Sequence, residues 1–203
     1  GCGKSTLAAA MLGLVRPHGG SIRIGGVALS ELRTDDHRRH VAAAGQALGL
    51  VPGTVHENIA LGCFGDEPVP EAAYEVPEVR ALVAELSAGE ETRVSGADEQ
   101  LSGGQQRRIG LARLVAREPR IVVLDEAFAG LDGSLRDRLR DKVLDWARAG
   151  GRTVIEISHE IADGRKADRV IVLDAGRIRE AGTFASLRAA GGAFAALADL
   201  QDG

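Results

Sequence analysis

Three short motifs supply the residue types that a phosphate-handling site needs. The 203-residue chain begins with GCGKST at 1–6, and LSGGQ at 101–105 and IVVLDE at 121–126 follow in that order. The first two motifs are rich in glycine, which lets backbone N–H groups approach an anion, and the third ends in two carboxylates. Because chance rarely places all three in this order, the sequence predicts chemistry on a nucleotide phosphate.

The phosphate loop, residues 1–6, matches the end of the pattern G-x-x-x-x-G-K-[ST]. Its lysine, Lys4, can reach the β- and γ-phosphates, and the Ser5 hydroxyl can ligate Mg²⁺. The alternative is a glycine-rich turn that happens to precede Lys-Ser-Thr. Since the full pattern needs another glycine three residues before Gly1, we expect the chain to be truncated inside this motif. The residues expected to contact the nucleotide are Gly1, Cys2, Gly3, Lys4, Ser5 and Thr6.

The acidic pair Asp125 and Glu126 follows four apolar residues, Ile121 to Leu124. Such a strand delivers the pair to its carboxyl end, where α/β sheets place their ligands. We expect Asp125 to hold Mg²⁺, usually through water, and Glu126 to act as general base on the attacking water. The alternative is a strand end that carries two solvated acids.

The LSGGQ motif predicts a second phosphate site. Ser102 can cap a helix that begins near Gln105, while Gly103 and Gly104 expose N–H groups to an anion. One chain with one nucleotide does not need two such sites, so we expect a head-to-tail pair in which this loop closes on the partner's ATP. The alternative is an ordinary serine N-cap.

Composition excludes several other classes of protein. A formal net charge of −4 and a sequence pI of about 5.8 give no broad basic surface for nucleic acid. The two cysteines, Cys2 and Cys63, show no metal-binding or disulfide spacing, so a reducing compartment is expected. The longest apolar stretch, Leu7 to Val15, is shorter than the ~20 residues that a membrane-spanning helix needs. Cys2 is either a reactive thiol, because it lies beside Lys4 in an anion loop, or an inert small residue.

Strands and helices are expected to alternate, which predicts an α/β fold. Apolar runs and turn residues predict strands at 21–24, 41–44, 121–124 and 153–157, a hairpin at 170–178, and helices at 5–15 and at the C-terminus. The strands at 121–124 and 153–157 are expected to be buried. The helix between them carries Leu135, Leu139, Val143 and Trp146 on one face. Prolines punctuate short helical patterns between Leu48 and Ala116, which predicts a helical subdomain at 48–116 and a core at 1–47 and 117–203.

Taken together, the ordered motifs resemble the ATP-binding domain of the ABC transporter family over nearly the whole chain. The resemblance implies a P-loop NTPase (RecA-like) core with a mostly parallel sheet flanked by helices, and ATP and Mg²⁺ as cofactors. It also implies three further site residues. Gln46 would contact the metal and the attacking water, His159 would sense the γ-phosphate, and Asp132 would belong to the loop through which two subunits communicate.

The segments at 53–62 and 176–201 resemble the exporter type of this family. That subtype implies an ATPase that powers transport by ATP-driven dimerisation with a second ATP-binding domain, in a homodimer or a heterodimer. It also implies a transmembrane domain fused upstream, so that the domain lies at the cytoplasmic face of the cell membrane. Two alternatives stay open: a soluble ABC-type ATPase not tied to transport, and a nucleotide-regulated binding module without turnover.

Some residues depart from the pattern of this family. The run before LSGGQ is Val94-Ser95-Gly96-Ala97-Asp98, which puts standard coupling to the membrane helices in doubt. Glu156 interrupts a strand that should be buried, and a buried carboxylate needs a partner. The remaining histidines, including His37, are expected at the surface. None of the departures removes a predicted catalytic group, so the site is expected to be active.

Overall fold

The computed structural model describes residues 2–45, 49–94 and 101–202. The chain divides into two compact units, one made of Gly1–His18 with Ile157–Gly203 and the other of Gly19–Glu156. We call them the terminal unit and the central unit and describe each by itself. The predicted division into a core and a helical subdomain follows other boundaries and stays a prediction.

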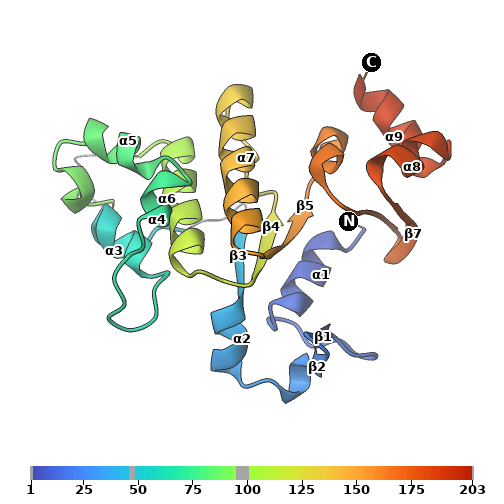
Figure 1. Cartoon of the computed structure of the whole chain (residues 1–203), viewed down its shortest axis with the longest axis horizontal. Coiled ribbons are helices and arrows are strands. Elements are labelled where there is room, and N and C mark those ends of the chain that lie inside the picture. Colours follow the sequence, from blue (N-terminus) through green and yellow to red (C-terminus); the bar gives the residue numbers. More distant parts are fainter. Residues whose placement is uncertain (1, 46–48, 95–100, 203) are drawn as a thin grey trace. The chain divides into compact units, whose positions relative to one another are not determined.

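A three-stranded sheet in the order β3-β4-β5 forms the centre of the α/β architecture (Figure 1). β3 (Val41–Gly45) and β4 (Ile121–Asp125) are parallel, and their register pairs Val41 with Ile121 and Gly45 with Asp125. The apolar run of β4 is buried against α7 (Gly133–Ala149), whose Leu139 and Val143 belong to the same core cluster. The predicted apolar face of this helix is therefore confirmed.

The last strand of this sheet, β5 (Thr153–Ile157), has the predicted bounds but is less buried than predicted. Only Ile157 is buried, and the three residues before it are half-buried. The reason is its place, because β5 is an outer strand of the described sheet and β4 lies in the middle. Glu156 is accommodated on this strand by an ion pair with Arg140 of α7.

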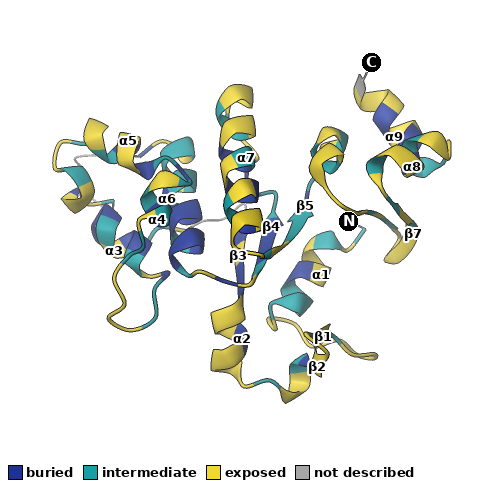
Figure 2. Ribbon diagram, in the orientation of Figure 1, coloured by how far each residue is buried: buried dark blue, intermediate teal, exposed yellow. Residues whose placement is uncertain are grey.

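Among the described residues between 55 and 116, four α-helices pack together (Figure 1). They are α3 (Val55–Ala60), α4 (Ala72–Glu75), α5 (Val79–Glu85) and α6 (Gly103–Ala116). Capping boxes begin both α3 and α6, at Thr54 and Ser102. A short 3-10 helix, η2 (Gly89–Glu91), follows α5. Many of the buried residues of the central unit lie in β3, β4, α6 and the inner face of α7 (Figure 2).

The first part of the central unit is small and mostly exposed. It consists of the two-residue strands β1 (Arg23–Ile24) and β2 (Val27–Ala28), the 3-10 helix η1 (Leu29–Glu31) and α2 (Thr34–His40). The expectation for His37 was wrong, because its exposure is only 7%. His37 lies on the inner side of α2, a position that the charged sequence of this helix did not reveal.

In the terminal unit, α1 (Lys4–Met11) is shorter than the predicted helix at 5–15. The predicted hairpin is confirmed as β6 (Val170–Asp174) and β7 (Arg177–Gly182), which are antiparallel. Its turn, Ala175-Gly176, has positive φ at both positions, as a type I′ hairpin turn requires. The 3-10 helix η3 (Ile161–Lys166) and the helices α8 (Phe184–Ala189) and α9 (Ala193–Asp202) complete the unit.

Within the described part of the chain, no helix has the length and apolar character needed to cross a membrane.

Candidate functional site

The phosphate loop of the terminal unit leads directly into the first turn of α1. Gly3 is the N-cap residue with φ 96° and ψ 11°, a left-handed conformation that glycine adopts without strain. Ser5 and Thr6 lie in the first turn, and the Lys4 Nζ atom is 3.6 Å from the Cys2 Sγ atom. A helix N-terminus presents unpaired N–H groups and a positive partial charge, and both favour an anion. Gly1 lies outside the described residues.

Outside the phosphate loop, the predicted site residue of the terminal unit is His159, which is exposed after β5. Its backbone carbonyl accepts a hydrogen bond of 2.8 Å from the Gln201 Nε2 atom. The Gln201 Oε1 atom in turn accepts a hydrogen bond of 2.8 Å from the Ile161 backbone N–H. Gln201 of α9 thereby fixes the backbone on which the histidine side chain is carried.

The acidic pair lies where the sequence predicted it, at the carboxyl end of β4. Asp125 is the last residue of the strand and Glu126 follows it, and both are half-buried. Parallel pairing in register brings the carboxyl ends of β3 and β4 to the same sheet edge, with Gly45 opposite Asp125. Gln46 follows Gly45 in the sequence but lies outside the described residues.

The LSGGQ motif forms the N-terminus of α6. The helix begins at Gly103, two residues before the predicted start, and Ser102 is its N-cap as predicted. The Ser102 Oγ atom accepts from the Gln105 backbone N–H at 3.2 Å, and the Gln105 Oε1 atom accepts from the Ser102 N–H at 2.8 Å. Since a hydroxyl both accepts and donates, the cap leaves the Ser102 O–H hydrogen able to donate to an anion.

Asp132 is the N-cap of α7. Its Oδ1 atom accepts from the Leu135 backbone N–H and from the Ser134 hydroxyl, both at 3.0 Å. The Leu135 N–H and then the Ser134 hydroxyl hold the pKa of this carboxyl below its usual range. Asp132 is exposed and stays a carboxylate, so it can accept further hydrogen bonds from outside the chain.

Two contacts inside the central unit connect these motifs, and neither was predicted from the sequence. The Arg107 Nη1 atom, on α6, donates to the carbonyl oxygens of Glu126 at 3.3 Å and Ala127 at 3.1 Å. A Cβ atom added at Gly104 would lie 3.4 Å from the Leu131 Cδ2 atom, so the start of α6 packs beside the residue before Asp132. The only available sequence clue was the place of Arg107 one helical turn after Gly103.

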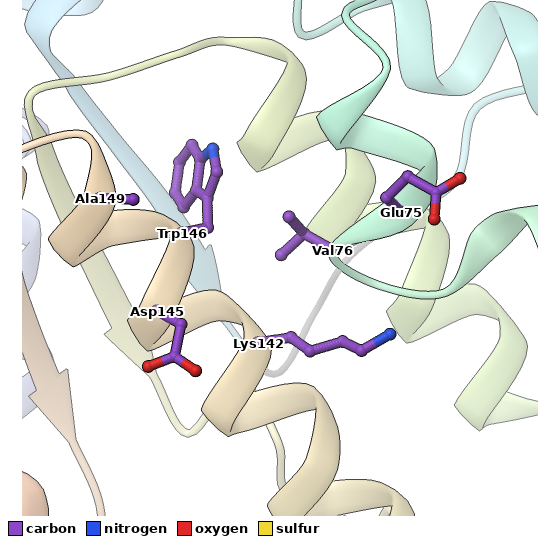
Figure 3. Close-up of a pocket in the computed structure, with 6 residues that line it drawn as sticks. All are labelled: Glu75, Val76, Lys142, Asp145, Trp146 and Ala149. Carbon is purple, nitrogen blue, oxygen red and sulfur yellow. The ribbon is translucent and has the colours of Figure 1, made fainter.

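A shallow pocket of about 470 Å³ lies elsewhere in the central unit, between α7 and the end of α4 (Figure 3). The Trp146 ring faces Val76 across it, and Lys142 extends toward the segment that carries Glu75 (Figure 3). None of the predicted site residues lines this pocket. Trp146 and Val76 pack against both hydrophobic clusters of the unit, so the pocket lies at the junction of those clusters.

The oxygen donors suit Mg²⁺. Among the residues that the structure describes, no three His, Cys, Asp or Glu side chains come together as a metal cage. Mg²⁺ is commonly held by one or two protein oxygens together with phosphate and water, and such a site needs no cage. The hydroxyl of Ser5 and the carboxylate of Asp125 are oxygen groups of the type that Mg²⁺ prefers.

The fold and these motifs define a P-loop nucleotide-binding domain. The sequence model of the family described as "ABC transporter" matches residues 1–129. The ABC multidrug transporter atrC of Emericella nidulans is 37% identical over the whole of this chain, which covers 16% of that protein. P-glycoprotein 14 of Caenorhabditis elegans is 36% identical, again over the whole chain, which covers 15% of it.

A solved structure of a bacterial Atm1-family ABC exporter with ATP bound matches the entire chain with a TM-score of 0.90 and 28% identity, and the chain covers 35% of that structure. The chain therefore belongs to the ABC transporter family, and it corresponds to the ATP-binding domain of the exporter type. It spans about a sixth of the length of the curated relatives described above.

Proposed function

We propose that this chain is the ATP-hydrolysing motor of an ABC exporter. The observation that carries the proposal is the placement of Asp125 and Glu126 at the carboxyl end of a buried parallel strand in a chain of this family. The relatives are named as multidrug transporters and as a P-glycoprotein, which supports a role in membrane transport.

The roles of the site residues follow from their chemistry. The phosphate loop binds the ATP phosphates through backbone N–H groups and Lys4. When bound, Mg²⁺ neutralises charge on the β- and γ-phosphates, and the residues that would hold it are Ser5, Asp125 and Gln46. Glu126 accepts a proton from the attacking water, and His159 hydrogen-bonds the γ-phosphate.

ATP joins two domains in this proposal. The Ser102 hydroxyl, the N–H groups of Gly103 and Gly104 and the Gln105 side chain contact the ATP held by the phosphate loop of a second domain. In the simplest case the second domain is another copy of this chain. Asp132, exposed at the start of α7, connects the two domains at their contact. Closure of this pair around ATP moves a transmembrane domain fused upstream, which places the chain at the cytoplasmic face of the cell membrane.

Substitution of the proposed general base tests this function. We expect Glu126→Gln to keep ATP binding and to lower turnover about 100-fold to 10,000-fold, because the amide cannot accept the proton. Glu118→Gln is a matched control, since Glu118 has a similar backbone conformation, with φ 49° against 53° for Glu126. The measurements are phosphate release and nucleotide binding by the purified full-length protein. Turnover by Glu126→Gln equal to that of the control would remove Glu126 from its role.

A further inference from the structure

Arg107 links the helix that starts with the LSGGQ motif to the backbone of the proposed catalytic carboxylate. It lies on α6, one helical turn after Gly103, and is half-buried. A single atom, Nη1, lies within hydrogen-bond distance of the Glu126 and Ala127 carbonyl oxygens, at 3.3 and 3.1 Å. The side chain thus spans from one motif to the next within the central unit.

The backbone that Arg107 contacts adopts an unfavourable conformation. Glu126 has φ 53°, in the left-handed region that residues with a side chain rarely occupy and that needs support from its surroundings. On one side, Ala127 and Phe128 supply that support, because both are buried in the core cluster with β4 and α7. On the other side, Arg107 holds the two carbonyl groups.

The charge of Arg107 strengthens this contact. Burial lowers the pKa of its guanidinium, which nevertheless stays protonated because arginine begins from so high a value. A charged donor forms a stronger hydrogen bond to a carbonyl than a neutral donor does. An apolar side chain at position 107 would leave the carbonyls without this donor.

We propose that Arg107 is a positioning residue that sets the direction of the Glu126 carboxylate through its backbone. The inference rests on the proposed function, in which Glu126 is the general base. It adds a connection between two nucleotides, because the LSGGQ end of α6 contacts the partner's ATP while Glu126 acts on the ATP of its own chain. The packing of Gly104 beside Leu131 gives α6 a second contact with the segment after β4.

Steady-state kinetics of the full-length protein test this role. We expect Arg107→Ala to lower kcat about 10-fold and to change the KM for ATP by less than about 2-fold, because the misplaced carboxylate acts only in the chemical step. Arg107→Lys keeps a charged donor and is expected to recover part of kcat. Arg148→Ala is the control, since Arg148 is an exposed arginine of α7 paired with Asp145. Thermal melting identifies any variant that fails to fold. If Arg107→Ala does not fold, the kinetics of Arg107→Lys are compared with those of the unsubstituted protein instead.

A double-mutant cycle separates positioning from a purely structural role. If Arg107 acts through Glu126, Arg107→Ala changes the residual turnover of Glu126→Gln by less than about 2-fold. The inference is overturned if Arg107→Ala leaves kcat unchanged, if its effect lies in KM, or if its full 10-fold loss recurs on Glu126→Gln. Failure of the proposed function looks different, because Glu126→Gln would then hydrolyse ATP at the unsubstituted rate.

Discussion

Arg140 and Glu156 form a two-pronged ion pair between α7 and β5. The Arg140 Nε atom donates to Glu156 Oε1 at 2.8 Å, and the Nη2 atom donates to Oε2 at 2.7 Å. The side chains are only 6% and 17% exposed. This pair explains the carboxylate that interrupts the apolar sequence of β5, and it ties the helix capped by Asp132 to the strand that precedes His159.

Breaking this pair from one side should destabilise the protein strongly. We expect Glu156→Val to lower the free energy of unfolding by about 3 kcal/mol, because it leaves a buried guanidinium without its carboxylate. The double variant Arg140→Leu with Glu156→Val should recover at least half of that loss, since both charges are then gone. Urea denaturation is measured for the unsubstituted protein, for Glu156→Val and Arg140→Leu singly, and for the double variant. A double variant as unstable as the sum of its single changes would contradict this account of the pair.

Trp146 should contribute to stability by joining two hydrophobic clusters. Its ring packs against both, and the Arg152 guanidinium lies 4.1 Å from the ring centroid. We expect Trp146→Ala to lower the free energy of unfolding by about 2–3 kcal/mol. The loss is smaller than for a fully buried tryptophan, because this ring is partly exposed. Circular dichroism during denaturation provides the measurement, and Trp146→Phe is the milder comparison. If Trp146→Ala lowered the free energy of unfolding by less than Trp146→Phe does, the ring would not hold the two clusters together.

Ionisation of Glu78 should make the folding stability of the protein depend on pH in the acidic range. Burial by itself raises the pKa of this carboxyl, but hydrogen bonds from Lys142 and Arg138 outweigh that effect and the pKa is lowered. Its Oε1 atom lies 3.0 Å from both the Lys142 Nζ and Arg138 Nε atoms. A lowered folded-state pKa gives stability that is present above the unfolded pKa and is lost as the pH falls through the folded pKa.

The melting temperature should therefore decrease as the pH is lowered below about 5, and Glu78→Gln should reduce that decrease. The amide keeps the shape of the side chain but cannot titrate. Glu91→Gln, which removes the charge of an exposed glutamate in η2, serves as the control. Identical pH profiles for Glu78→Gln and the unsubstituted protein would show that Glu78 does not contribute.

Gly62 should tolerate no side chain, because α6 lies too close to it. A Cβ atom at this position would approach the Arg113 carbonyl oxygen to 2.2 Å and the Ala116 Cβ atom to 2.9 Å. Gly62→Ala therefore forces α3 and α6 apart, and we expect a cost of about 1–3 kcal/mol. Gly19→Ala is the comparison, because Gly19 has open space around its Cβ position and no positive φ. Equal melting temperatures for Gly62→Ala and the unsubstituted protein would contradict this close approach.

The sequence predicted the parts of the site whose chemistry is local. The apolar run of β4 placed Asp125 and Glu126, and the Ser102 cap follows from hydrogen bonds within four residues. The α/β fold class was predicted from the alternating strand and helix patterns, and the hairpin of β6 and β7 was predicted from its turn residues.

Contacts between distant segments were not predictable in this way. The partner of Glu156 lies 16 residues away and the contact between Arg107 and Glu126 spans 19, so neither follows from a local period. The burial of β5 was overestimated because its apolar sequence does not tell whether a strand lies in the middle or at the side of a sheet. His37 was misplaced because a short charged helix gives no clear apolar face.

The most direct test of the central claim is a cross-link between two protomers. The proposal places Cys2 of one protomer and Ser102 of another against the phosphates of one ATP. The full-length protein with Ser102→Cys, Cys63→Ser and Glu126→Gln is treated with a short thiol cross-linker, with and without ATP. We predict a cross-linked dimer joined through positions 2 and 102 that forms only when ATP is bound. Bound ATP with no such product, or the same yield without nucleotide, would contradict the shared ATP site.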